Sequence, residues 1–249
     1  MSLGLIPIPA VAQVILRVAI ANGSRQVRLG SSTTATVVDA QGRPAGQLAP
    51  MRAQMAQFNQ GYVSLGAMRS GYLWVRPAPE GLVYVGDRWY RGQVLLYPRS
   101  QGVLAINYVE LDTYLYSVVG AEMYPSWPAA ALMAQAVAAR SYAFFKRLRP
   151  VDRLYDIGAT ERHQVYKGLH SEHPATLQAV HATRGQVLTH KGGVVMTQYA
   201  ATDDIVTDVF KGRGMSQHGA NRLAQQNYSY LQILNHFYPG TRLGKIEGY

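Results

Sequence analysis

Residues 118–142 constrain the fold more than any other stretch of the chain. They read VVGAEMYPSWPAAALMAQAVAARSY and hold one acid, Glu122, and one base, Arg140. Alanine favours helix, and a helix with little side-chain bulk lets other backbone segments approach closely. We therefore predict a central, buried helix whose small side chains are Ala129, Ala130, Ala131, Ala134, Ala136, Ala138, Ala139 and Ala143.

The ends of this helix are marked by capping and breaking residues. Ser126 is a candidate N-cap, and Pro128 falls in the first turn, where no backbone donor is needed. The helix is predicted to run to about Leu148, because Arg149-Pro150 disfavours its continuation.

A shorter helix is expected just before it. It enters at Leu111-Asp112, passes Val118 and is predicted to end at Gly120. Glu122 would then lie in a short turn between two helices, in an apolar setting. Glutamate usually occupies a solvated surface, and a surface turn carboxylate is the alternative. A lone carboxylate fixed on two helices suits proton transfer.

The charge and the cysteine content limit the classes of function. The chain has 24 basic and 14 acidic residues, for a net charge of +10, and no cysteine. Disulfides, thiol chemistry and Cys-ligated metals are excluded. The scattered basic residues indicate attraction to an anionic partner: a cell-wall polymer, a membrane surface or nucleic acid.

The N-terminus resembles the end of a secretory signal. An apolar run ends at Ala10-Val11-Ala12, an A-x-A-type cleavage pattern, although no basic residue precedes it. We expect residues 1–13 to be the remnant of such a signal and the protein to be extracytoplasmic, in the periplasm or cell wall. No apolar stretch approaches the ~18 residues that span a bilayer.

An α+β fold with a β-rich first part is predicted. Residues 14–105 contain short apolar or alternating runs separated by Gly, Pro or Asp, as in small antiparallel sheets, and the first strand is expected to stop at Asn22-Gly23. Residues 106–249 are expected to form the mixed catalytic part. Its further elements are a helix at 174–182, a hairpin turning at 191–193, a helix near Ser216 and a last helix after 228–230.

Several motifs, taken in order, resemble the SpoIID/LytB family of sporulation and amidase-enhancer proteins. The similarity covers about residues 90–243 and is carried by YLYSVVGAEM (114–123), AQAVAARSYA (134–143), HQVYKG (163–168), ATRGQVLT (182–189), GMSQHGA (214–220) and YPGT (238–241).

The resemblance implies peptidoglycan work outside the cytoplasmic membrane. Some members are lytic transglycosylases that act on peptide-stripped glycan strands, and others enhance a partner N-acetylmuramoyl-L-alanine amidase. The family's essential acid corresponds to Glu122 and its helix arginine to Arg140. Lytic transglycosylation needs one carboxylate, because the sugar's own C6 hydroxyl is the nucleophile, whereas ordinary glycosidases use two.

Further side chains are candidates for contact with glycan. Arg140 is predicted to bind substrate, to pair with Glu122 or to tie loops together inside the core. The other predicted substrate-binding residues are Gln135, Ser141, Gln164, Tyr166, Tyr199, Ser216 and Gln217. Structural hydrogen bonding is the alternative for Gln135 and Ser141, core packing for Tyr166 and helix capping for the loop at Ser216.

No cofactor or metal is expected. Some relatives place a metal ligand in the loop of His163 with help from Cys, which is absent here, and the other histidines nearby lack convincing spacing. Two departures from the family pattern stand out: the segment after Tyr199 is short, and Lys211 occupies the position of a usual His. They leave a non-catalytic role open.

We therefore expect a peptidoglycan lytic transglycosylase that binds glycan strands through a site centred on Glu122. The alternative is a non-catalytic glycan-binding enhancer of a separate amidase. Nucleic-acid binding has only the charge in its favour, since no basic helix or aromatic RNA motif is present.

Overall fold

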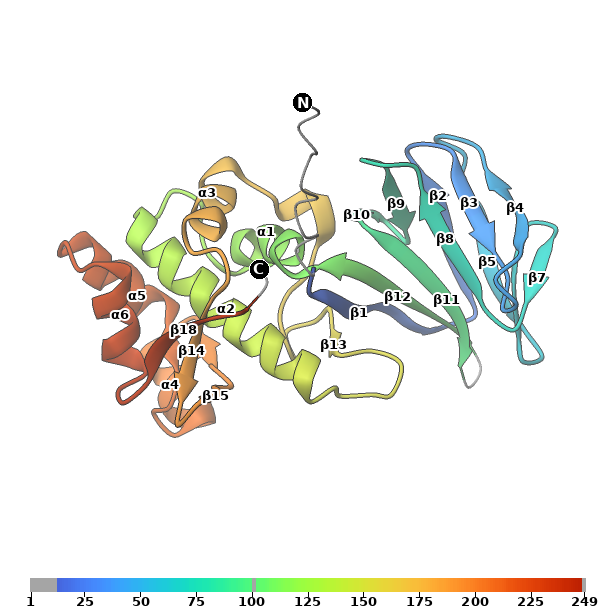
Figure 1. Cartoon of the computed structure of the whole chain (residues 1–249). Helices are drawn as coiled ribbons and strands as arrows, with labels where there is room; N and C mark the ends of the chain where they lie inside the picture. The colour runs from blue at the N-terminus through green and yellow to red at the C-terminus, as the bar shows by residue number, and fades with distance from the viewer. Residues whose placement is uncertain (1–12, 100–101, 248–249) are drawn as a thin grey trace, which may run out of the picture.

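The computed structural model describes residues 13–99 and 102–247 and shows an α+β protein with a β-rich N-terminal part, as predicted. Figure 1 shows two large sheets gathered at one end of the molecule and most of the helices at the other. The strands of the first part are β1 (Ile15–Ser24), β2 (Gln26–Ser31), β3 (Ala35–Val38), β4 (Pro44–Leu48), β5 (Gln54–Asn59), β6 (Tyr62–Leu65), β7 (Met68–Ser70), β8 (Leu73–Pro77), β9 (Leu82–Val85), β10 (Arg88–Arg91), β11 (Gln93–Arg99) and β12 (Gly102–Glu110).

These strands form two sheets that share one apolar core. The larger sheet has the order β13-β1-β12-β11-β8-β3-β4 and the smaller one β10-β9-β2-β5-β6-β7. Alternate residues of β8, such as Leu73 and Val75, lie in this core, while Trp74 between them lies on the outer face of the larger sheet. The pairing is antiparallel throughout, apart from β1 with the two-residue β13 (Ile157–Gly158).

Asn22-Gly23 does not end the first strand, contrary to the prediction. β1 continues to Ser24 beside β12, with register shifts between Ala19 and Ala21 and between Asn22 and Ser24. The irregular pairing absorbs the positive φ of Gly23, which is +92°, within the strand. The chain then passes at Arg25 into β2 of the other sheet.

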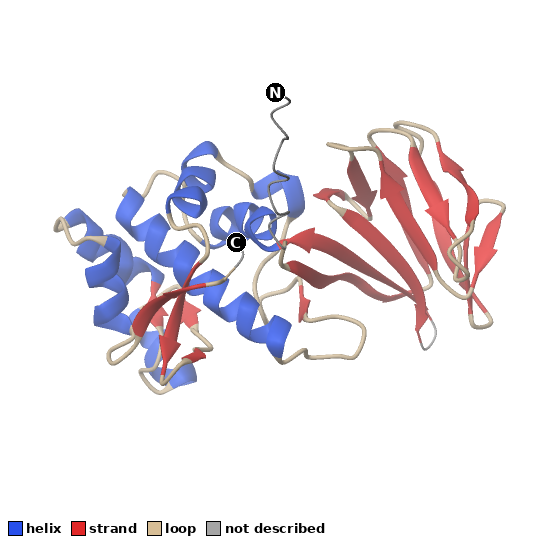
Figure 2. Ribbon diagram, in the orientation of Figure 1, coloured by secondary structure: helices blue, strands red, loops and turns tan. Residues whose placement is uncertain are grey.

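The second part is built from helices with small sheets beside them (Figure 2). Its helices are α1 (Leu111–Glu122), α2 (Ala129–Leu148), the 3₁₀ turn η1 (Gly168–Ser171), α3 (Pro174–Ala182), α4 (Asp203–Phe210), α5 (Gln217–Gln225) and α6 (Tyr230–Phe237). Its short strands are β14 (Gln186–His190), β15 (Gly193–Val194), β16 (Tyr199–Ala200), β17 (Met215–Ser216) and β18 (Arg242–Lys245). The β14–β15 hairpin turns at Lys191-Gly192, within the predicted turn.

The alanine-rich helix α2 is central, as predicted. It lies against α1, α3, α5, α6 and β14. Its alanines contribute to two apolar clusters: Ala136, Ala139 and Ala143 to the core shared with the sheets, and Ala131, Ala134 and Ala138 to the one shared with α5 and α6. Small side chains along α2 are what allow so many elements to approach it.

Two predicted helix ends are wrong. Gly120 does not end α1, which runs on to Glu122; a Cβ at Gly120 would collide with the carbonyl oxygen of Ser171, so this glycine permits close packing inside the helix. Ser126 does not cap α2, whose N-cap is Pro128 with no side-chain hydrogen bond.

Within the described residues, sequence analysis also missed seven strands, the 3₁₀ turn η1 and one α-helix. The missed strands are short, and most carry polar residues among few apolar ones; they are β4, β5, β7, β10, β13, β17 and β18. Helix α4 had a readable signal: Thr202 caps it by accepting from the Ile205 N–H, two acids stand in its first turn, and Lys211 ends it with a φ of +54°.

The predicted boundary between the two parts falls within β12, and as a domain boundary it stays a prediction. Residues 1–12, which hold almost all of the expected signal remnant, lie outside the described residues. Among the helices of the described ranges, none combines the length and the apolar character needed to cross a membrane.

Candidate active site

Glu122 is the last residue of α1, and both of its carboxylate oxygens are held by protein groups. The backbone N–H of Val165 donates to Oε1 over 2.9 Å, and Nε2 of Gln217 donates to Oε2 over 3.3 Å. The side chain is half-buried. Three distant segments, α1, the loop before η1 and α5, therefore converge on one carboxylate that keeps access to solvent.

The pKa of Glu122 lies above its ordinary value. Burial is the largest cause, because it disfavours the charged form. The hydrogen bonds from Val165 and Gln217 act in the opposite direction, while Glu161 raises the pKa further and Lys167 lowers it. A carboxyl group with a raised pKa keeps its proton to higher pH than an ordinary carboxyl, which suits it to donate a proton and then accept one.

Gln164, the residue before Val165, connects segments beside Glu122 through three hydrogen bonds. Its Nε2 donates to the Tyr199 hydroxyl over 2.9 Å and to the Ala139 carbonyl of α2 over 3.1 Å, and its Oε1 accepts from the Tyr114 hydroxyl over 3.0 Å. Only 1% of the surface of Gln164 is exposed, so its amide holds Tyr114 and Tyr199 in place and is not presented to a ligand. Burial raises the pKa of Tyr199 well above its ordinary value, so its phenol stays protonated.

Ser216 and Gln217 reach the site through the start of α5. The parallel pair β16–β17 sets Tyr199 beside Met215 and Ala200 beside Ser216. Ser216 is buried and accepts from the Gly219 N–H, which is the capping alternative, while Gln217 extends to Glu122. The structure thus brings together four predicted residues around Glu122: Gln164, Tyr199, Ser216 and Gln217.

Arg140 belongs to the core and not to the site. It has no exposed surface, and its guanidinium lies 2.8 Å from Asp112 with further bonds to the Val180 and Gln186 carbonyl oxygens and the Thr183 hydroxyl. It does not pair with Glu122. The expected substrate contact is incompatible with this burial, and the alternative that Arg140 ties segments together describes what the structure shows.

Three more predicted contact residues are buried away from solvent. Tyr166, 2% exposed, packs between Tyr90 and Tyr114 and donates to Asn107, so it is a core residue and not a sugar-binding wall. Ser141 donates to the Val137 carbonyl and accepts from the Leu188 N–H. The amide of Gln135 is also buried, and neither of its polar atoms has a hydrogen-bond partner among the described residues.

His163 lies at the edge of the site. Its pKa is lowered, first by burial and then by the charges of Lys146 and Arg162. A small cavity of about 90 Å³ beside it is also lined by Tyr142, Glu161 and Tyr199. Across residues 13–99 and 102–247, no group of three or more His, Asp or Glu side chains is placed to hold a metal ion.

Sequence reasoning missed two groups that hold predicted residues in place: the Val165 N–H, which holds Glu122, and Asp112, which holds Arg140. The Val165 N–H could not be found from side-chain types, because any residue supplies a backbone donor. Asp112, the partner of Arg140, carried a signal: an acid near the start of an apolar helix and the one arginine within the apolar residues 118–142 are expected to be paired.

The raised pKa of Glu122 predicts a pH-dependent cost to stability. Between the ordinary value of 4.5 and the higher folded pKa, the unfolded chain loses this proton while the folded chain keeps it, so stability falls as pH rises through that window. Glu122→Gln removes the effect. In urea unfolding, the free energy of unfolding of the variant should rise relative to that of wild type as pH increases from 4 to 8. An equal difference between the two proteins at both pH values would contradict the raised pKa of Glu122.

Two comparisons with known proteins found similar sequences. Residues 99–190 match the model of SpoIID, described as stage II sporulation protein. An uncharacterized protein of Brachyspira hyodysenteriae is 35% identical over 123 residues, 49% of this chain and 33% of that protein. The chain thus spans about a third of the length of the curated relative that it matches. The predicted motifs beyond residue 190 lie outside the family match. Residues 99–190 of this chain are therefore similar to the SpoIID family.

Proposed function

We propose that the protein remodels peptidoglycan in a sporulation-related role and that it does so as a lytic transglycosylase. The observation that carries the proposal is the environment of Glu122: one half-buried carboxyl with a raised pKa, held by Val165 and Gln217. This acid stands at the position of the essential glutamate that the SpoIID resemblance implies. No second carboxylate contacts it among the hydrogen bonds and ion pairs of the described residues.

In the proposed reaction, protonated Glu122 donates its proton to the glycosidic oxygen, and the bond between the anomeric carbon and that oxygen breaks. The leaving sugar departs with a free hydroxyl. Ionised Glu122 then takes the proton from the C6 hydroxyl of the remaining sugar, whose oxygen bonds to the anomeric carbon. The product is a 1,6-anhydro end, and Glu122 regains its starting proton, so one carboxyl serves both steps.

The neighbours of Glu122 have separate roles in this scheme. Gln217 and the Val165 N–H stabilise the carboxylate formed after the first proton transfer. Tyr199, held by Gln164, stands beside the site as a neutral hydroxyl that can donate to a sugar oxygen. Burial of the acid limits the hydration of its charged form, which keeps it able to act as a donor.

The second candidate is a glycan-binding enhancer of a separate N-acetylmuramoyl-L-alanine amidase. The short segment after Tyr199, folded as α4 with Lys211 at its end, favours it, because a longer segment is usual there in the family. Both candidates place the protein outside the cytoplasm, on peptidoglycan glycan strands.

Analysis of the reaction products distinguishes the transglycosylase from the enhancer. Purified glycan strands, with and without stem peptides, are incubated with the protein and examined by mass spectrometry. The proposal expects anhydro-ended fragments, mainly from peptide-free strands. Retained strand binding with no new ends, together with faster peptide release when an amidase is added, would establish the enhancer instead.

A further inference from the structure

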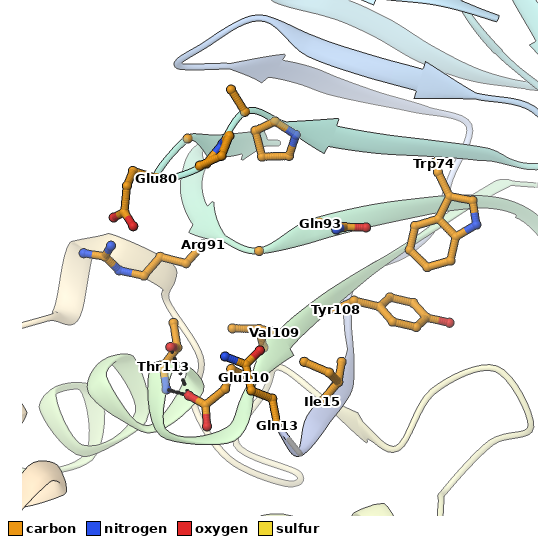
Figure 3. A pocket seen from close by; sticks show the side chains of 15 residues that line it. Gln13, Ile15, Trp74, Glu80, Arg91, Gln93, Tyr108, Val109, Glu110 and Thr113 are labelled. Carbon is orange, nitrogen blue, oxygen red and sulfur yellow. Dashed lines mark hydrogen bonds between the residues drawn. The ribbon is translucent and has the colours of Figure 1, made fainter. Parts of the chain in front are cut away.

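A cavity of about 530 Å³ opens beside the β-rich part (Figure 3). It lies between the loop at 77–81, the facing ends of β11 and β12, and the start of α1. None of the side chains that contact Glu122 lines it. Its volume falls in the range of small-molecule binding pockets.

Two aromatic side chains form one end of the cavity. Trp74 of β8 and Tyr108 of β12 meet edge to face, with ring centroids 4.5 Å apart, and both are half-buried. They lie on the outer face of the larger sheet, beside the buried Leu95 and Ile106. The guanidinium of Arg76 lies 5.5 Å from the Trp74 ring. The aromatic pair is therefore fixed by packing while part of its surface stays open.

Polar side chains form the rest of the wall. Glu80 and Arg91 lie near each other at the end opposite Trp74, and Gln93 lies between that end and Trp74 (Figure 3). Arg91 is held by Glu172 at 2.9 Å, and Glu110 accepts from the N–H and hydroxyl of Thr113. The wall thus offers carboxylate acceptors, guanidinium donors and an amide that can do both.

We propose that this cavity is a second saccharide-binding site that holds a sugar unit of the glycan strand. The identity of the strand rests on the proposed function. An aromatic ring packs against the C–H face of a pyranose, and its hydroxyl and N-acetyl groups need mixed donors and acceptors. A phosphate ligand fits poorly, because Glu80 and Glu110 would repel it, and an apolar ligand would leave these charged groups desolvated.

The scaffold connects this site rigidly to the acid. Glu110 caps α1 and Thr113 lies in its first turn, and Glu122 ends the same helix, roughly 14–18 Å away along its axis. Asn107 of β12 bonds the backbone carbonyl oxygens of Arg91 and Gln93 and accepts from Tyr166, beside Gln164. A glycan strand bound in the cavity would stay attached to the protein between successive cleavage reactions at Glu122.

The test measures binding in a Glu122→Gln background, where the proposed cleavage is absent. Fluorescently labelled, peptide-free glycan strands are titrated with this protein, with Trp74→Ala and Gln93→Ala added singly, and with Tyr62→Ala as control. Tyr62 is an aromatic residue of the other sheet, 46% exposed. Thermal unfolding of each variant checks the fold, and Gln93, whose side chain is exposed, can be replaced without loss of core packing.

Both cavity variants should bind strands about tenfold more weakly, the scale of a contact worth ~1.4 kcal/mol, while Tyr62→Ala binds like its parent. Equal affinity of Gln93→Ala, folded Trp74→Ala and the parent would overturn the proposal. The proposed function is contradicted by a different result. If wild-type protein binds strands through Trp74 but forms no anhydro ends, the second saccharide-binding site is supported and the transglycosylase activity is contradicted.

Discussion

Glu122→Gln is expected to lower the rate of glycan cleavage by 10²–10⁴-fold, the typical contribution of a general acid–base group. Glutamine has nearly the same shape and can still accept from the Val165 N–H, but it cannot donate a proton to the glycosidic oxygen. The rate of anhydro-end formation from peptide-free strands, followed by mass spectrometry, measures the effect.

The control for this substitution is Glu247→Gln, because Glu247 is exposed near the end of the described chain. It should cleave at the wild-type rate. Strand affinity of Glu122→Gln should stay close to wild type, so that the loss appears in turnover. Cleavage by Glu122→Gln at the wild-type rate would show that another residue is the general acid.

Arg140→Ala is expected to destabilise the fold by about 3–5 kcal/mol, the typical cost of removing one partner of a buried ion pair. Asp112 would remain buried, and three acceptors on α3 and β14 that Arg140 now serves would lose their donor. That loss is a large part of the 5–15 kcal/mol typical of a folded domain. Urea unfolding at neutral pH measures it.

Arg184→Ala provides the matched control, since Arg184 lies 4.0 Å from the same Asp112 but is largely exposed. Its removal should cost about 1 kcal/mol or less. Equal unfolding midpoints for the two variants would show that the buried pair contributes no more than the exposed one.

The fold was predictable where a segment carried its own local signal. Helix α3 begins and ends at the predicted residues, because Pro174 starts it and the chain turns at Arg184-Gly185. The end of α1 was not predictable. Gly120 normally indicates a helix stop, and only the approach of Ser171, fifty-one residues later, explains a glycine inside the helix.

The candidate site was predictable in its chemistry and less so in its contacts. Glu122 stood out as a lone acid in an apolar stretch, and the order of motifs added Gln164 and Gln217. The contacts of each side chain separate the neighbours of the acid from the other core residues, because Gln164 and Arg140 are both buried, and these contacts depend on tertiary packing. Arg140, Ser141 and Gln164 are all polar in sequence, yet only the fold shows that Arg140 faces Asp112.

The two hydrogen bonds to Glu122 span 43 and 95 residues of sequence. Gln217 and Tyr199 both lie beyond residue 190, where the family match stops. A fragment limited to the matched residues would therefore carry the acid but lack Gln217, the donor to one of its oxygens, and the Tyr199 hydroxyl that accepts from Gln164. The shortest piece of this chain that assembles the acid with its partners must extend at least to α5.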